Sequence, residues 1–418
     1  MAQSTQQEMS YGQALKGSRL SFFLAGVGFS SIGDGMLIST IPLVAIGIHG
    51  SMPIAFAVSL TAAAAYVSSV CLAIPFSLGR LRFPVKTSLI ADCLLRGVTL
   101  AALGVAAAGG SLSIEVLIGA LLVGSCLRSL SASGIRLAAI SLVPSHGRYA
   151  VNGLLSTVRQ FALYVAGPAL GGLVAAVFSP EWALVIDGAT FLPLLVATLV
   201  TLSSEPPAPA GPERTESGLK VLRTLPIAWR LLVIVFFYNL FYMPVEVALP
   251  LFVDGPLAGN GKALGIVWTL FGAGAIIGAL ATNHLRHVPQ RPLLIGIVAG
   301  WGAAMIGLAS AQSVLWASIA FFVAGVIYAP FTPVAYTYLH TFLSEEEAQP
   351  VITLWSTVST LAAPLGLAAA GPLVYALGGR GSIFLSALVT LALSFVAWRI
   401  IGSQPSPDPR QPDGQTSE

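Results

Sequence analysis

The sequence predicts an all-α membrane protein in which twelve transmembrane helices form two pseudo-symmetric six-helix bundles. Three observations predict this class. Of the 418 residues, 56% are hydrophobic and only 9% are charged, whereas ordinary soluble domains carry roughly 25% charged residues. The apolar residues recur in runs long enough for the roughly 20-residue helix that crosses a bilayer. The basic residues gather in alternate connections between these runs, as the positive-inside rule requires.

This composition excludes several classes of protein. With so few charges the chain cannot build a soluble surface, which excludes a soluble enzyme, a nucleic-acid-binding protein and a disordered protein. P-loop, GxSxG, HExxH and clustered His/Cys patterns do not occur in the sequence, although metal and catalytic sites commonly use them. We therefore expect no enzymatic activity and no bound metal ion.

The apolar runs give the expected spans in chain order. The first bundle is expected at 20–48, 54–79, 87–109, 113–137, 149–178 and 182–202, and the second at 230–253, 262–283, 293–311, 314–339, 350–377 and 382–402.

Polar segments divide the chain into five parts. A polar N-terminal segment, 1–19, precedes the first bundle, 20–202. The linker 203–229 begins with SSEPPAPAGPERTESG, which is too rich in Pro, Ser and Glu for a core, and ends in a basic stretch that predicts a short helix on the membrane surface. The second bundle, 230–402, precedes a Pro-rich tail, 403–418, that is expected to be disordered.

The basic residues fix the expected orientation. Fourteen Lys and Arg residues fall on one side of the predicted spans, and only Lys262 and Arg380 fall on the other. Because basic loops stay in the cytoplasm, both termini and the central linker are expected there.

The two halves share short sequence similarities. IPLVA (41–45) in the first span corresponds to LPLFV (249–253) in the seventh, and LLSTV (154–158) to LWSTV (354–358). Such repeats are typical of carriers whose two bundles flank a central pathway.

Two acidic residues lie deep within predicted spans. Asp34 is in the middle of the first span and Glu246 is in the seventh. Aligned on Pro42 and Pro250, they lie about one helical turn apart, so both are placed to face one central cavity. A carboxyl group away from water is stabilised in its neutral form, so it can exchange a proton near neutral pH. The alternative is that each carboxylate pairs with an arginine of a neighbouring helix in a structural role.

Arginines lie at similar depth. Arg128, in the fourth span, is expected to neutralise Asp34 or Asp187, to modulate proton uptake by Asp34, or to bind an anionic substrate. Asp92 and Arg96 are four residues apart on one helix face, which predicts a structural charge pair.

Other residues are candidates for substrate binding and helix packing. Aromatic walls with a few polar tips suit amphipathic organic ligands, and small residues allow helices to approach closely. The candidates for substrate binding are Phe241, Tyr242, Tyr328 and Arg159, and the packing motif GPALGG contains Gly167, Pro168, Gly171 and Gly172.

Four segments resemble one known family, the major facilitator superfamily, in its drug and siderophore exporter branch. This branch includes enterobactin exporters and macrolide efflux proteins. Gly79 stands where the family has an Asp between its second and third spans. The similar segments are GFSSIGDGMLISTIPLVAIGIHGS (28–51), ADCLLRG (91–97), VNGLLSTVRQFALYVAGPALGGLVAAVF (151–178) and VIDGATFL (185–192).

The resemblance implies the major facilitator fold and alternating access by two rocking bundles. It implies a monomeric exporter in the inner (cytoplasmic) membrane that moves a small amphipathic organic molecule, such as a drug or siderophore, by proton antiport. Protons are then the coupling ion, with no other cofactor and no nucleic-acid partner. Asp34 would couple the protons, assisted by Arg128 and Glu246. Two alternatives remain open: proton-coupled uptake of a small molecule or metal chelate, and a non-transporting membrane sensor.

Overall fold

The computed structural model describes residues 11–77, 84–144, 147–202, 226–285, 287–342 and 345–401. All regular secondary structure in these residues is helical. Predictions for the start of the chain, for the loop that contains Gly79, for most of the linker 203–229 and for the tail 403–418 lie outside them.

The helices follow the predicted order. Most predicted spans begin and end within a few residues of a helix. The first half contains α1 (Tyr11–Leu15), α2 (Ser18–Ile48), α3 (Ile54–Ser77), α4 (Val85–Ala108), α5 (Ile114–Ser141), α6 (Arg148–Phe161), η2 (Ala162–Ala166), α7 (Gly167–Val177) and α8 (Pro180–Thr201). The second half contains α10 (Pro226–Asp254), α11 (Gly261–Leu285), α12 (Gln290–Ala309), α13 (Val314–Tyr328), α14 (Phe331–His340) and α15 (Glu345–Ile401).

Nine helices within the described ranges are long and apolar enough to cross a membrane. Two shorter apolar stretches, Ile54–Val67 and Ile114–Cys126, lie in α3 and α5. The helix α15 contains one non-helical residue, Gly378, with φ 68° and ψ 174°, at the place where the sequence predicts a break between two spans. The all-helical membrane class is confirmed, and the count of twelve spans stays a prediction.

A π-helical turn connects α6 to α7. The Gly167 amide donates to the Ala162 carbonyl, five residues back, in η2. Pro168 explains this turn, because it has no N–H to give to the Tyr164 carbonyl, four residues back. The turn therefore widens just before the GPALGG motif.

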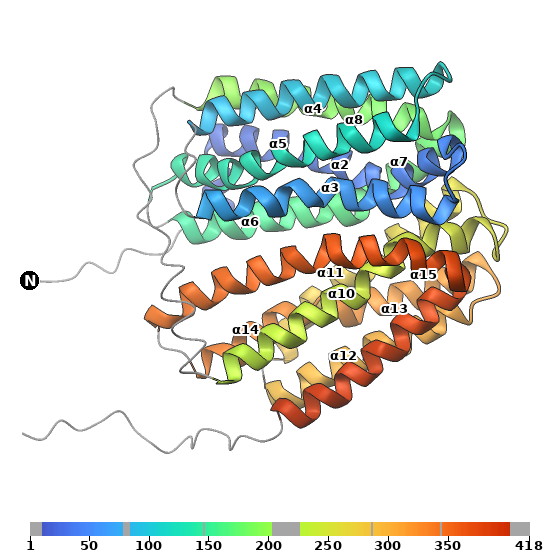
Figure 1. Ribbon diagram of the computed structural model, residues 1–418. Coiled ribbons are helices and arrows are strands. Elements are labelled where there is room, and N and C mark those ends of the chain that lie inside the picture. Colours follow the sequence, from blue (N-terminus) through green and yellow to red (C-terminus); the bar gives the residue numbers. More distant parts are fainter. Residues whose placement is uncertain are drawn as a thin grey trace, which may run out of the picture.

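The helices of each half lie together. Figure 1 shows α2 to α8 on one side and α10 to α15 on the other. In the first half α8 packs against α2 and α4, and in the second α15 packs against α10 and α12. The halves contact each other chiefly where α3 meets α15 and where α7 meets α11.

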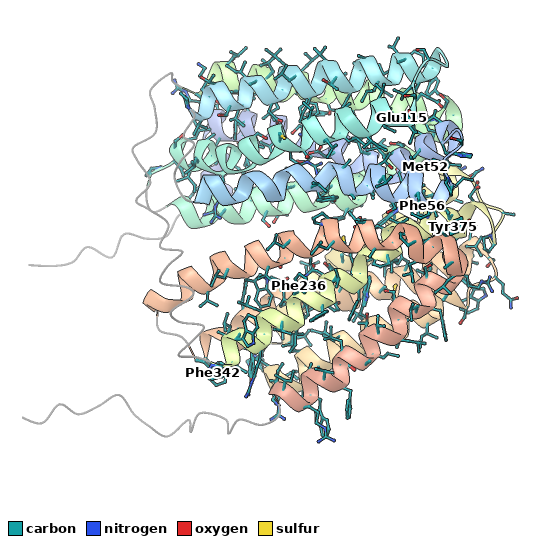
Figure 2. The ribbon with its side chains drawn as sticks, viewed as in Figure 1. Met52, Phe56, Glu115, Phe236, Phe342 and Tyr375 are labelled. Atoms are coloured by element: carbon teal, nitrogen blue, oxygen red, sulfur yellow. The ribbon has the colours of Figure 1, made fainter. Side chains whose placement is uncertain are left out.

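The Phe56 and Tyr375 side chains of α3 and α15 lie side by side at the right-hand end of the molecule in Figure 2. The Phe56 and Tyr375 rings are 5.7 Å apart there. The Ser59 hydroxyl donates a 2.6 Å hydrogen bond to the Leu367 carbonyl. The two halves are therefore joined at this end by both an aromatic contact and a buried hydrogen bond.

Candidate functional site

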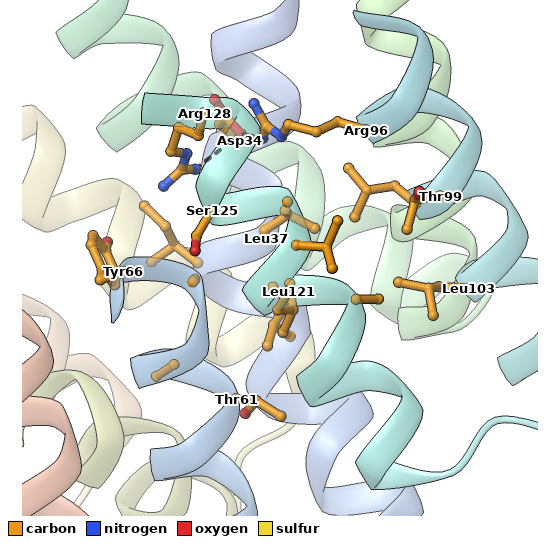
Figure 3. Close-up of a pocket in the computed structure, with 18 of the residues that line it drawn as sticks. Asp34, Leu37, Thr61, Tyr66, Arg96, Thr99, Leu103, Leu121, Ser125 and Arg128 are labelled. Atoms are coloured by element: carbon orange, nitrogen blue, oxygen red, sulfur yellow. Dashed lines mark hydrogen bonds and ion pairs between the residues drawn. The ribbon is translucent and has the colours of Figure 1, made fainter. Parts of the chain in front are cut away.

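A cavity of about 220 Å³ lies mainly within the first half. Its wall is largely apolar and comes from α2, α3, α4 and α5, with two residues, Glu246 and Trp268, from the second half. Asp34, Arg96 and Arg128 form its charged part, as Figure 3 shows. A few charged groups on an apolar wall are typical of sites for small amphipathic molecules.

The Asp34 carboxylate is shared by two arginines from two other helices. Arg96 of α4 donates to Asp34 Oδ1, and Arg128 of α5 donates to the same oxygen at 3.0 Å. Charge-assisted hydrogen bonds of this kind are about twice as strong as neutral ones. The side chain of Asp34 is 18% exposed and that of Arg128 is 31% exposed, so both reach the cavity.

Arg96 is held on three sides. Besides Asp34, it lies 3.6 Å from the Asp92 carboxylate on its own helix. Its guanidinium also lies 4.6 Å from the centre of the Phe191 ring of α8, a cation–π arrangement. The predicted Asp92–Arg96 pair is present, but it is part of a larger cluster that includes Asp34.

Glu246 faces the cavity from the second half. Tyr242 lies one turn earlier on α10, and its side chain interacts with the Glu246 carboxyl. Within the described residues, no Lys, Arg or His nitrogen lies within 4.0 Å of Glu246. The structure thus brings the two predicted acids, Asp34 and Glu246, to one cavity with different surroundings.

The predicted aromatic residues and Arg159 lie outside this cavity lining in the part of the chain that the structure describes. Tyr242 and Tyr328 stack with ring centres 5.4 Å apart, and Tyr242 lies 5.3 Å from the Trp301 ring. Phe241 packs against another phenylalanine of α10. These rings form the interior of the second half, and their role in substrate binding stays a prediction.

The GPALGG motif lies between two helices. A Cβ added at Gly167 would lie 2.5 Å from the Gly35 Cα of α2, and one added at Gly172 would lie 2.6 Å from the Gly265 Cα of α11. Real side chains do not reach such distances, so only glycine permits this packing. The motif therefore packs α7 against α2 of the first half and against α11 of the second half.

Sequence reasoning missed three features of the site. It did not assign Arg96 to Asp34, because the two residues are far apart in sequence and on different helices. It did not select Tyr66 and Trp268 for the cavity wall, since single aromatic residues in apolar runs carry no distinguishing pattern.

Among the described residues no group of three or more His, Cys, Asp or Glu side chains could hold a metal ion.

The helical fold, with an apolar cavity whose wall contains a few charged side chains, defines a polytopic membrane transporter. The family comparison agrees, since the model of the Major Facilitator Superfamily matches residues 23–285 and, in a second match, 247–417. The chain belongs to the major facilitator superfamily, a family of transporters and not of enzymes, so the family predicted from the sequence is confirmed.

Curated relatives and solved structures give further similarities. The chain is 25% identical over 244 residues to the multidrug efflux pump Tap of Mycolicibacterium fortuitum, covering 56% of this chain and 59% of that protein. It is 26% identical over 268 residues to the pump of the same name from Mycobacterium bovis BCG, covering 60% and 61%. The matches thus span about three fifths of these relatives.

A bacterial homologue of the human lysosomal transporter Spinster, in an inward-facing and occupied conformation, shares the fold. Its TM-score is 0.73 at 14% identity, over 93% of this chain and 98% of that one.

Proposed function

We propose that this chain is a secondary active transporter that exports a small amphipathic organic molecule in exchange for protons. Family membership and the similarity to multidrug efflux pumps support drug export. The observation that carries the proposal is the Asp34 carboxylate, bound by two arginines on the wall of an apolar cavity that Glu246 faces from the other half.

Proton binding and substrate binding are coupled through Asp34 in this scheme. A proton that reaches Asp34 competes with the guanidinium groups of Arg96 and Arg128 for the same oxygen. Protonation of Asp34 therefore releases its arginines, and the freed Arg128 changes the charge that a substrate meets. Glu246 offers a second carboxyl group across the cavity, with no arginine to displace in the described part of the chain.

Twelve spanning helices in two bundles, 20–202 and 230–402, form the proposed architecture. The linker 203–229 and both termini are in the cytoplasm, and the protein lies in the inner membrane as a monomer. The break at Gly378, inside α15, supports this count. The excess of basic residues on one side supports the orientation.

The proposed substrate is largely apolar with at least one polar group. The wall contains leucines, isoleucines and Trp268, and its charged groups are Asp34, Arg96 and Arg128 from the first half and Glu246 from the second. A ligand that placed its polar group near Arg128 or Glu246 would bury the rest of its surface against side chains of matching polarity.

Flux measurements in everted membrane vesicles test the proposal. Energised vesicles that contain the protein should accumulate a lipophilic dye, and an uncoupler should abolish the accumulation. Asp34→Asn should lose at least ten-fold in proton-driven accumulation while remaining inserted and monodisperse.

Two outcomes would contradict the proposal. Accumulation that survives the uncoupler would exclude proton coupling. Loss of flux in Glu246→Gln combined with full flux in Asp34→Asn would move the coupling role from Asp34 to Glu246.

A further inference from the structure

The buried charged cluster beside the cavity has one more acid than it has bases. Its members in the described residues of α2, α4, α5 and α8 are Asp34, Asp92, Asp187, Arg96 and Arg128. Three carboxylates against two guanidiniums would leave a net charge of −1. An uncompensated charge away from water is expensive, and a buried acid avoids the cost by holding a proton.

Asp187 is the acid of this cluster without a base. Asp34 contacts two arginines and Asp92 contacts one. Within the ranges that the structure covers, no Lys, Arg or His nitrogen lies within 4.0 Å of Asp187. The side chain is 0% exposed, and its Oδ2 atom has no hydrogen-bond partner.

The contact between Asp187 and Thr190 gives the buried carboxyl little stabilisation as an anion. The Thr190 hydroxyl lies 2.7 Å from the Asp187 main-chain carbonyl and 3.2 Å from Asp187 Oδ1. A hydroxyl has a single hydrogen, so the Thr190 hydroxyl shares it between the main-chain carbonyl and Asp187 Oδ1. The weaker, longer arm of this shared bond compensates little of a buried negative charge on the carboxyl.

Asp187 lies directly behind the Asp34 site. A side chain at Gly33, the residue before Asp34, would collide with Asp187 Oδ1 and Thr190 Oγ1. Phe191, one turn further along α8, stacks on Arg96. Asp187 itself is absent from the described cavity lining, whereas Asp34 belongs to it.

We propose that Asp187 is a protonated carboxylic acid in this conformation and a proton reservoir for Asp34. In the transfer step the O–H bond of Asp187 breaks and an O–H bond forms on Asp34. Arg96 moves from Asp34 to the carboxylate newly formed on Asp187. The charge of the cluster does not change, because the proton stays within it. Asp34 then exchanges this proton with the cavity. The use of the proton in transport rests on the proposed function, whereas its presence on Asp187 does not.

Infrared spectroscopy of the full-length protein in lipid nanodiscs tests the assignment without transport. A Glu246→Gln background removes a second buried carboxyl group with no arginine within 4.0 Å among the described residues. In this background we expect a band from a protonated carboxylic acid at neutral pH, and we expect Asp187→Asn to abolish it. Asp254→Asn removes an exposed acid and should leave the band unchanged. A band that persists in Asp187→Asn overturns the proposal.

Two further measurements complete the test, one spectroscopic and one of transport. Thr190→Val leaves Asp187 in place but removes its hydroxyl neighbour, so the band should shift in frequency, and an unshifted band contradicts the assignment.

In everted vesicles, Asp187→Asn should lose at least ten-fold in proton-driven accumulation while still exchanging substrate in the absence of a proton gradient. An assigned band together with uncoupler-resistant flux in the unmodified protein would reject proton coupling and retain the protonated Asp187. Full proton-driven accumulation in Asp187→Asn would reject the reservoir role.

Discussion

The two arginines that contact Asp34 differ in their exposure and in the number of groups that they contact. Arg96 is 8% exposed and contacts two carboxylates and an aromatic ring. Arg128 is 31% exposed and contacts Asp34 alone among the described acids. Removal of one member of a buried ion pair leaves an unpaired charge, whereas a more open group is compensated by water.

This difference predicts unequal losses of stability. Arg96→Gln should lower the free energy of unfolding by about 3–5 kcal/mol, because Asp34 and Asp92 both lose a partner. Arg128→Gln should cost about 1 kcal/mol, because Asp34 keeps Arg96. Denaturation of both variants in the same detergent would compare them. Equal losses, or a larger loss for Arg128→Gln, would contradict this account of the cluster.

The helix α7 shows how a short motif determines an element's packing. Pro168 widens the preceding turn, and the glycines that follow bring α7 against α2 and α11. A methyl group at Gly172 would meet the backbone of Gly265, which cannot move as a flexible side chain can.

Gly172→Ala should therefore destabilise the protein by about 1–3 kcal/mol, the usual cost of overpacking, and slow transport. Gly119→Ala is the matched control, because a Cβ at Gly119 would have nothing within 4 Å. Alanine also favours a helix over glycine by about 1 kcal/mol, so this control should be neutral or stabilising. Melting temperatures of the two variants check the prediction, and equal melting temperatures would show that the contact between α7 and α11 tolerates a methyl group.

The two halves form one molecule through a small set of contacts. The buried Ser59–Leu367 hydrogen bond is one of them, and a buried hydrogen bond contributes about 0.5–1.5 kcal/mol. An alternating-access carrier must break such contacts in each cycle.

Ser59→Ala should shift the population toward separation of the halves at the end where Phe56 and Tyr375 are in contact, by roughly three- to ten-fold. Distances between spin labels on α3 and α15 would measure the shift. Ser310→Ala removes an exposed hydroxyl that bonds only within its own helix and should leave the distances unchanged. An unchanged distance distribution in Ser59→Ala would mean that this hydrogen bond does not hold the halves together.

At this scale the sequence predicts the fold well, because apolar runs, Gly/Pro breaks and basic loops are local patterns. The break at Gly378 falls between two predicted spans. The sequence also predicts that Asp34 and Glu246 are functional candidates, because acidic residues in apolar runs are energetically costly. The sequence does not predict that Arg96 donates a hydrogen bond to Asp34, or that Asp187 packs against Gly33. These contacts depend on how four helices pack in three dimensions.

The ion pairs among Asp34, Asp92, Arg96 and Arg128 have a consequence for the membrane voltage. These four groups carry two negative and two positive charges, and all belong to helices of the first half. A unit charge moved across the bilayer gains or loses about 2.3 kcal/mol per 100 mV. Since this set is neutral as a whole, reorientation of the first half carries no net charge from these groups through the electric field. The membrane voltage then acts on the exchanged proton and on any charge of the substrate. This cluster adds no voltage dependence to the return of the substrate-free transporter.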